Sequence, residues 1–188
     1  MMLIEVRWHG RGGQGVVTGS NLLARAMISE GKYAQHFPEF GPERAGAPVK
    51  AYTRISDEPI EIHCGVYEPD MVIVIDPMMS KNPQEYVYGL KKGGDIFLNH
   101  PGGDEEIVKW AKNAGFKLHV LDARKISLEE ISREIYNVPM LAAMLKVRKL
   151  CDPSTLEKVL AQRFSGRVLE MNLKLVKRAF EEVETLVG

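Results

Sequence analysis

A glycine-rich turn directly after the first apolar segment constrains the fold more than any other feature of this chain. The segment Leu3–Val6 has the character of a strand, and Gly10, Gly12 and Gly15 follow it with G-x-G-x-x-G spacing. A helical pattern begins directly after them. Together a strand, a glycine turn and a helix N-terminus form a phosphate pocket, because glycine permits close approach and the first helical N–H groups point at the anion. The sequence therefore predicts an α/β protein whose first turn binds, or once bound, a phosphorylated ligand.

Composition narrows the class of protein further. The 188 residues favour one domain, and 25 basic and 25 acidic side chains give a formal net charge of zero. A balanced charge argues against nucleic-acid binding and against a polybasic membrane surface. The two cysteines, Cys64 and Cys151, are far apart, which excludes a self-contained four-cysteine iron–sulfur site and is typical of a reducing compartment. The apolar runs are too short to span a bilayer and no signal peptide is visible, so we expect a cytoplasmic protein that binds no membrane.

The periodicity of apolar residues predicts a three-layer α/β fold of Rossmann-like type. We expect a twisted, mainly parallel sheet with Met71–Ile75 as its central buried strand, because this run is continuous and β-rich. A helix is predicted from Asn82 to Leu90, since Pro83 and Glu85 stand at positions that favour a helix start. The other elements expected in this part are strands at 3–8, 33–37, 95–99 and 116–121, a helix at 14–30 that Gly31 ends, and a helix from its cap Asp104 to Asn113.

A hairpin and a proline-rich loop interrupt the alternation of strands and helices. Val49–Ile55 and Ile60–Cys64 flank a short turn, which predicts a β-hairpin inserted into the sheet. Residues 38–48 contain three prolines and two glycines, so regular structure is not expected there. Their aromatic and charged side chains indicate an ordered functional loop. Within it Arg44 serves either as a ligand clamp or interface residue, or as the partner of Glu43 in a salt bridge that orders the loop.

The C-terminal third is predicted to be helical throughout. Ser127–Glu130 has the pattern of a capping box, and Asp152 precedes a proline at a further helix start. Residues 167–187 form one long amphipathic pattern. We therefore expect a single domain over residues 1–188, with an α/β sheet core at 1–125 and a helical tail at 126–188 packed on it.

Several polar residues leave their roles open. Arg11 suits a phosphate or carboxylate ligand, and equally a surface pair with Glu39 or Glu43. Asp76 follows the central strand, where a carboxylate faces a ligand or caps the next segment. The histidines and cysteines lack paired ligand spacing, so no metal site is expected. Neither a nucleophile elbow nor a carboxylate dyad is recognisable, so no catalytic residue is assigned.

The glycine turn by itself does not identify the ligand. A dinucleotide site requires an acidic residue after the second strand, but Glu30 lies at the end of the helix and Glu39 comes late, beside Pro38. A Walker-type loop is excluded because no Gly-Lys-Ser/Thr follows the glycines. A stand-alone Rossmann-type nucleotide-binding oxidoreductase, and a scaffold whose turn binds nothing, remain as alternatives.

Two motifs together resemble a known family. Residues 10–18 read Gly-Arg-Gly-Gly-Gln-Gly-Val-Val-Thr, and residues 37–49 read Phe-Pro-Glu-Phe-Gly-Pro-Glu-Arg-Ala-Gly-Ala-Pro-Val. Both closely resemble the gamma subunits of pyruvate:ferredoxin oxidoreductases, in the 2-oxoacid:acceptor oxidoreductase family, and the resemblance covers most of the chain. The second motif favours the pyruvate type; a gamma-type subunit for a different 2-oxoacid is the alternative. One departure is Ala45, where many relatives have a larger polar or basic residue.

The resemblance implies a subunit of a complex that oxidatively decarboxylates pyruvate with CoA to acetyl-CoA, CO2 and reduced ferredoxin. It also implies that thiamine diphosphate, Mg2+ and iron–sulfur clusters reside in other subunits, of alpha, beta and delta type. This chain is then expected to bind no redox cofactor and to be inactive alone. The residues that the resemblance assigns to CoA phosphates or to a neighbouring subunit are Gly10, Arg11, Gly12, Gly13, Gln14, Gly15 and Arg44.

Overall fold

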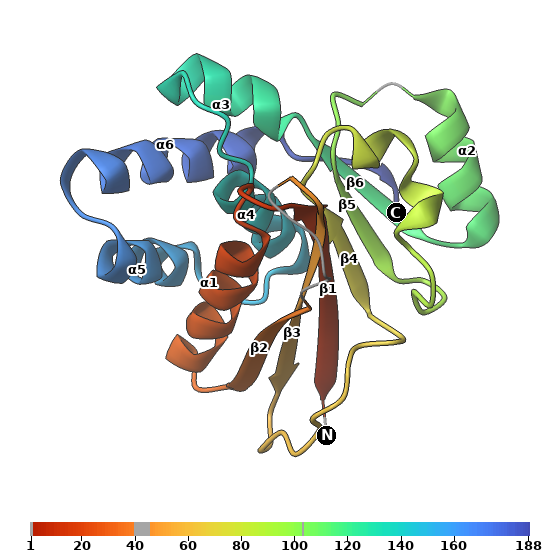
Figure 1. The fold of residues 1–188 in the computed structure, drawn as a ribbon, viewed down its shortest axis with the longest axis horizontal. Helices are drawn as coiled ribbons and strands as arrows, with labels where there is room; N and C mark the ends of the chain where they lie inside the picture. The colour runs from red at the N-terminus through yellow and green to blue at the C-terminus, as the bar shows by residue number, and fades with distance from the viewer. Residues whose placement is uncertain (1, 40–45, 103) are drawn as a thin grey trace.

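The computed structural model describes residues 2–39, 46–102 and 104–188, which form a seven-stranded sheet with helices on both faces (Figure 1). The strand order is β2-β3-β1-β4-β5-β6-β7. The strands are β1 (Leu3–Arg11), β2 (Tyr33–Glu39), β3 (Pro48–Ser56), β4 (Met71–Val74), β5 (Asp95–Asn99), β6 (Lys117–Leu121) and β7 (Glu184–Val187). The helices are α1 (Val16–Ser29), α2 (Glu105–Ala114), α3 (Ala123–Ile131), α4 (Asn137–Arg148), α5 (Pro153–Arg163) and α6 (Gly166–Glu182), with short 3-10 helices η1 (Met79–Lys81) and η2 (Pro83–Glu85).

The pairing of the strands gives the sheet a majority direction. β4 pairs in parallel with β1 and with β5, and β5 pairs in parallel with β6. β3 runs antiparallel to both β1 and β2, and β7 runs antiparallel to β6. Within the described sheet β3 and β7 therefore oppose the other five strands. The predicted α/β class with a mainly parallel sheet is confirmed.

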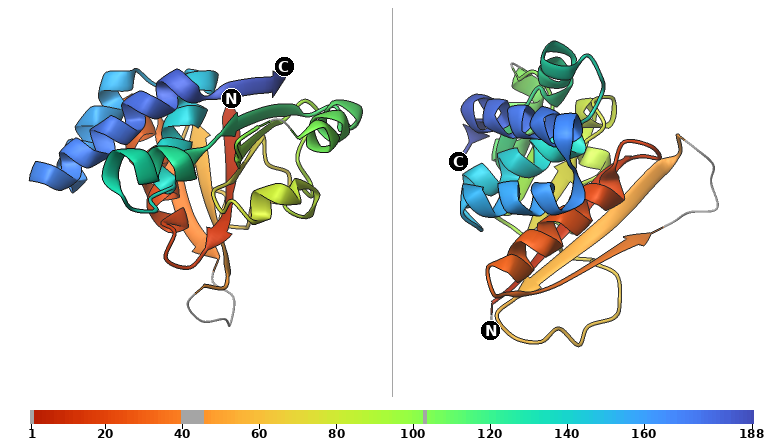
Figure 2. Two further views of the ribbon diagram at one scale, coloured as in Figure 1. Left: turned by 90° about the horizontal axis from the view of Figure 1, so that it is seen from above. Right: turned by 90° about the vertical axis from the view of Figure 1, so that its left-hand side faces the viewer.

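The central strands are buried on both faces, which requires a layer of helices on each side. Ile73 and Ile75 pack in the core that contains α1 and α4, whereas Val72 and Val74 pack in the core that contains α2. Figures 1 and 2 show α1 and α4–α6 gathered on one side of the sheet, with α2 on the other. Helix α4 is buried continuously over residues 138–145. Among the described helices, none is long and apolar enough to cross a membrane.

Several local predictions are confirmed by the helix ends. Asp104 caps α2 by accepting hydrogen bonds from the N–H groups of Glu106 and Ile107. Asp152 caps α5 in the same way, and Gly31, at φ 78°, follows the end of α1. Within α1, Gly19 faces the sheet, because a Cβ at this position would lie 3.0 Å from the Trp8 ring.

The predicted hairpin is wrong in its second strand. Residues 48–56 form β3, but residues 60–64 form no strand, and β3 pairs instead with β1 and β2. The reason is Arg54, a buried side chain that points away from α1. Its guanidinium donates hydrogen bonds to the carbonyls of Ile62, Cys64 and Gly65, which hold this segment against the face of the sheet. The segment therefore does not pair with the edge of β3, and β2 pairs there instead.

The predicted helix at 82–90 is also wrong. The chain forms η1 and η2 there, and Asn82 gives no side-chain cap to a described residue. The carbonyls of Tyr86 and Tyr88 turn inward to accept hydrogen bonds from buried Arg7. Gly89 has φ 72°, and a Cβ there would lie 2.1 Å from the Tyr67 carbonyl oxygen. These inward carbonyls and the left-handed glycine are incompatible with a continuing α-helix.

Two boundaries in the C-terminal third differ from the predictions. Helix α3 begins at Ala123 under the cap of Asp122, so the predicted capping box at Ser127 lies inside the helix. Helix α6 ends at Glu182, and the last residues form β7 rather than a helical turn. Strand β7 supplies hydrogen bonds to the edge of β6, and the Thr185 hydroxyl oxygen lies 2.8 Å from His119 Nδ1.

Candidate ligand site at the carboxyl edge of the sheet

The glycine turn lies where an α/β sheet places its ligand sites. It connects β1 to α1, and β1 stands between antiparallel β3 and parallel β4. On one side of β1 the sheet continues with β3 and β2, and on the other side with β4, β5 and β6. In open α/β sheets, ligands bind in the crevice outside the carboxyl ends of the strands at the position where the strand order reverses. Asp76, Asn99 and Asp122 follow β4, β5 and β6 at the same edge. The six predicted site residues of the turn, Gly10 to Gly15, therefore lie together. Arg44, the seventh predicted residue, lies outside the described residues.

Hydrogen bonds within the turn use part of its donor set. The N–H of Arg11 donates to Gln14 Oε1 at 2.8 Å, that of Gly12 to the Ala47 carbonyl at 3.0 Å, and that of Gln14 to the Arg11 carbonyl at 3.1 Å. In the described part of the chain, the N–H groups of Gly13 and Gly15 have no such acceptor. The turn is rigid through its own contacts and offers these remaining donors beside the start of α1.

Asp76 connects the turn to the loop after β4. Its Oδ2 accepts from Gln14 Nε2 at 2.6 Å and lies 3.7 Å from Arg11 Nε, while its Oδ1 accepts from the Met79 N–H at 2.8 Å. Asp76 thus accepts from the first N–H of η1, which is the capping role among the two that the sequence left open, and it also contacts the turn. The alternative pair between Arg11 and Glu39 does not form, because Glu39 bonds to Lys50 and Tyr52.

Steric requirements also explain two glycines of the turn. A Cβ at Gly10 would lie 2.6 Å from Ile75 Cγ1 and 2.7 Å from Val16 Cγ2. Gly15 has φ 80°, and a Cβ there would lie 2.6 Å from Asn137 Nδ2. No local pattern indicates the contact with Asn137, since α4 is far away in the chain. Close packing of the turn accounts for these two glycines independently of a ligand.

We expect Gly15→Ala to destabilise the fold by about 2 kcal/mol, because it adds a steric clash to an unfavourable backbone angle. Gly13→Ala is the matched control, since Gly13 has φ 94° but open space around its Cβ position. It is expected to cost about 1 kcal/mol. Chemical denaturation of both variants measures the difference. Equal losses would show that the contact with Asn137 is unimportant.

A cavity of about 570 Å3 adjoins the turn. Gln14 and Asp76 form one wall, and the ends of β5 and β6 form another. Burial lowers the pKa of His100, whose Nδ1 accepts from the Gly102 N–H, so the neutral ring presents its Nε2–H. Burial, aided by nearby Glu134, raises the pKa of Tyr136 to about 12. The remaining lining residues are Pro77, Met78, Lys81, Asn99, Pro101, Asp122 and Arg124.

Two charged side chains that line this cavity are engaged in other contacts. Arg124 is paired with Glu134 at 3.0 Å, and Asp122 caps α3. Across residues 2–39, 46–102 and 104–188, no cluster of three His, Cys, Asp or Glu side chains could hold a metal ion. Lys81 and the His100 Nε2–H are donors toward an anionic group, and the volume is in the range of small-molecule sites.

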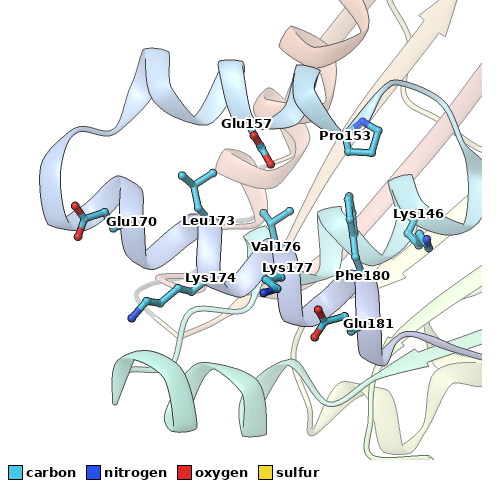
Figure 3. Close-up of a pocket in the computed structure, with 10 residues that line it drawn as sticks. All are labelled: Lys146, Pro153, Glu157, Glu170, Leu173, Lys174, Val176, Lys177, Phe180 and Glu181. Atoms are coloured by element: carbon cyan, nitrogen blue, oxygen red, sulfur yellow. The ribbon is translucent and has the colours of Figure 1, made fainter.

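A second hollow, of about 650 Å3, lies between α4, α5 and α6 (Figure 3). Leu173, Val176 and Phe180 form its apolar part. Its rim alternates basic and acidic side chains, namely Lys146, Lys174, Lys177, Glu157, Glu170 and Glu181. Because the basic and acidic side chains of the rim are equal in number, the rim favours neither an anionic nor a cationic ligand. We therefore take the cavity at the carboxyl edge of the sheet as the candidate site.

The fold and the site define a Rossmann-like domain with a packed glycine turn, an adjoining cavity and no recognisable redox centre among the described residues. The family model of pyruvate ferredoxin/flavodoxin oxidoreductase matches residues 5–182. The chain belongs to this family.

Close relatives agree in length and in kind. A Thermococcus litoralis protein named pyruvate/ketoisovalerate oxidoreductases common subunit gamma is 43% identical over 180 residues, which are 96% of this chain and 97% of the relative. The pyruvate synthase subunit PorC of Methanothermobacter thermautotrophicus is 41% identical and covers 98% of each chain. The crystal structure of the pyruvate oxidoreductase subunit PORC (EC 1.2.7.1) of Thermotoga maritima has a TM-score of 0.85 at 38% identity, over 98% of this chain and 99% of the other.

These relatives confirm the resemblance seen in the two motifs. The chain is a gamma-type component of a pyruvate:ferredoxin oxidoreductase, the enzyme that converts pyruvate and CoA to acetyl-CoA and CO2 while reducing ferredoxin. It works as one subunit of a complex that contains others. The alternative of a stand-alone nucleotide-binding oxidoreductase is not supported.

Proposed function

We propose that this chain is the subunit that presents a rigid anion-binding turn to the CoA of the complex, or to the neighbouring subunit that holds CoA. The observation that supports this most directly is the geometry of the turn. Its N–H groups at Gly13 and Gly15 stand at the N-terminus of α1, where the helix dipole favours negative charge. CoA carries phosphate groups that match these donors.

Arg11 is the side chain best placed to assist. It is 43% exposed, and its 3.7 Å separation from Asp76 is longer than a hydrogen bond. Its Nη1 donates to the Gly46 carbonyl at 3.3 Å, a long and exposed hydrogen bond that the guanidinium can exchange for one to a phosphate, which it matches in geometry and charge. Arg44 remains the second proposed residue. Lys81 and His100 provide further donors from the adjoining cavity.

The redox chemistry of the proposed complex belongs to other subunits. Thiamine diphosphate, Mg2+ and iron–sulfur clusters need carboxylate, carbonyl or thiolate ligands. The two thiols here, exposed Cys64 and partly buried Cys151, do not form such a set. We propose partners of alpha, beta and delta type and electron transfer to ferredoxin through them. The isolated chain should then show no pyruvate turnover and no tightly bound flavin or nicotinamide.

Substitution of the arginines tests this proposal in the assembled complex. Arg11→Ala and Arg44→Ala are each expected to raise the apparent KM for CoA about tenfold, or to weaken subunit assembly, because each removes a charge-assisted hydrogen bond. Steady-state kinetics and native mass spectrometry measure the two effects. Lys32→Ala, at the far end of the sheet from the turn, is the control. Unchanged CoA affinity and unchanged assembly in both arginine variants would refute the proposal.

A second candidate concerns the substrate. The Thermococcus relative is named as a subunit common to pyruvate and ketoisovalerate oxidoreductases. We propose that this chain likewise serves more than one 2-oxoacid by joining different catalytic subunits. Copurification from native cells, followed by assays with pyruvate and with a branched 2-oxoacid, distinguishes a shared subunit from a pyruvate-specific one.

A further inference from the structure

Arg7 is a buried cation without a carboxylate partner. Its side chain is completely buried on β1, on the face that points away from α1. Its Nε donates to His9 Nε2 at 3.0 Å, and its Nη2 donates to the carbonyls of Tyr86 and Tyr88. Its Nη1 has no hydrogen-bond partner in the described part of the chain. Buried guanidinium groups are normally paired with an anion, so this charge is uncompensated.

The neighbouring groups do not neutralise that charge. Burial, together with the charge of Arg7, lowers the pKa of His9 to about 3, so the imidazole is neutral. Lys50 Nζ lies 2.9 Å from Glu39 Oε1, and the two charges of this exposed pair cancel. Arg54 on the adjacent strand is matched by Glu5. Of the three cations Arg7, Lys50 and Arg54, Arg7 is therefore the one that makes no direct contact with a described carboxylate.

One exposed tyrosine covers this charge, and a second lies beside it in the chain fold. The Arg7 guanidinium lies 3.9 Å from the centre of the Tyr88 ring, and Lys50 Nζ lies 5.8 Å from the same ring. The Tyr88 side chain is 50% exposed and that of Tyr67 is 73% exposed. Their backbones adjoin, since a Cβ at Gly89 would touch the Tyr67 carbonyl. We call Lys50, Tyr67 and Tyr88, with Arg7 beneath them, the Tyr88 patch.

We propose that the Tyr88 patch docks an acidic segment of another subunit of the complex. This inference rests on the proposed role of the chain as one subunit of a larger assembly. Tyrosine anchors an interface with little loss of side-chain entropy, and a cation under its ring makes the phenol O–H a better donor to a carboxylate. A second copy of this chain is a poor occupant, because twofold pairing would bring the same positive patch against itself.

The proposal is tested by binding of this chain to the remaining subunits of its complex, immobilised on a biosensor. Combined in one chain, Tyr67→Ala and Lys50→Gln are expected to raise the Kd about tenfold. They are also expected to make the Kd depend less on salt concentration. Tyr33→Ala and Lys32→Gln are the matched controls. Tyr33 is 49% exposed and Lys32 forms an exposed pair with Asp57, both at the opposite end of β2 and β3 from Lys50.

The outcomes separate this inference from the proposed function. Control variants should bind within twofold of the wild type, and wild-type binding should weaken as salt increases. If the wild-type chain binds but the Tyr67 and Lys50 variants bind equally well, or no worse than the controls, the Tyr88 patch is not the interface. If the wild-type chain does not bind the other subunits, the proposed function fails and this inference fails with it. A photo-reactive residue in place of Tyr67 should cross-link to another subunit; an adduct with a second copy would overturn the assignment.

Discussion

Replacement of Arg54 by methionine is expected to lower the free energy of unfolding by about 3 kcal/mol and the melting temperature by roughly 6–12 °C. The Arg54 side chain is 1% exposed and pairs with Glu5 at 2.8 Å. It also holds the carbonyls of the segment that crosses the sheet face, including that of Cys64 at 2.7 Å. Methionine fills a similar volume but leaves the Glu5 charge and these carbonyls without their donor.

A matched substitution separates this effect from loss of a surface charge. Lys32→Met removes the cation of an exposed ion pair and is expected to change stability by less than about 0.5 kcal/mol. Thermal and urea unfolding of both variants give the comparison. If Arg54→Met unfolds at the wild-type temperature, the segment across the sheet face is held by other contacts, and our explanation of the missing hairpin strand is wrong.

The core of the fold was predictable because its elements carry strong local signals. Met71–Ile75 is a continuous β-rich run, and Asp104 and Asp152 stand at positions where only a helix start satisfies their side chains. The missing hairpin strand and the missing helix at 82–90 share one cause, since both occur where long-range contacts decide the local structure. Arg54 and Arg7 lie on strands, yet they determine the conformation of segments 8 to 81 residues later by donating hydrogen bonds to their carbonyls. The periodicity of apolar residues does not predict such long-range contacts.

The candidate site was predictable in position but not in its internal contacts. Glycine spacing after a strand identifies the turn, and a polar residue after each parallel strand marks the same edge. The link from Gln14 to Asp76 depends on the order of strands in the sheet, which no local pattern specifies. Likewise, the requirement for glycine at position 15 comes from Asn137 on a distant helix. The assignment of the turn and Arg44 to CoA remains a prediction.

Acidification is expected to destabilise the protein through His9. Burial is the main cause that lowers the pKa of His9 in the folded chain to about 3, from its ordinary value of 6.5. Above pH 6.5 the ring is neutral in both states and its full contribution is present. Below that pH the unfolded chain binds a proton that the folded chain excludes, so stability falls as the pH decreases toward 3. The loss attributable to His9 is about 2 kcal/mol near pH 5.

The variant His9→Gln isolates this contribution, because a glutamine oxygen can still accept a hydrogen bond from Arg7 but does not titrate. His36 and His100 also have pKa values lowered by burial and contribute to the slope in both proteins. The informative quantity is therefore the difference between wild type and variant in urea unfolding from about pH 7 to pH 5. The wild type should lose about 2 kcal/mol more than the variant over this range. Parallel curves would mean that His9 titrates normally in the folded chain, and that the positive charge beneath the Tyr88 patch does not act on it.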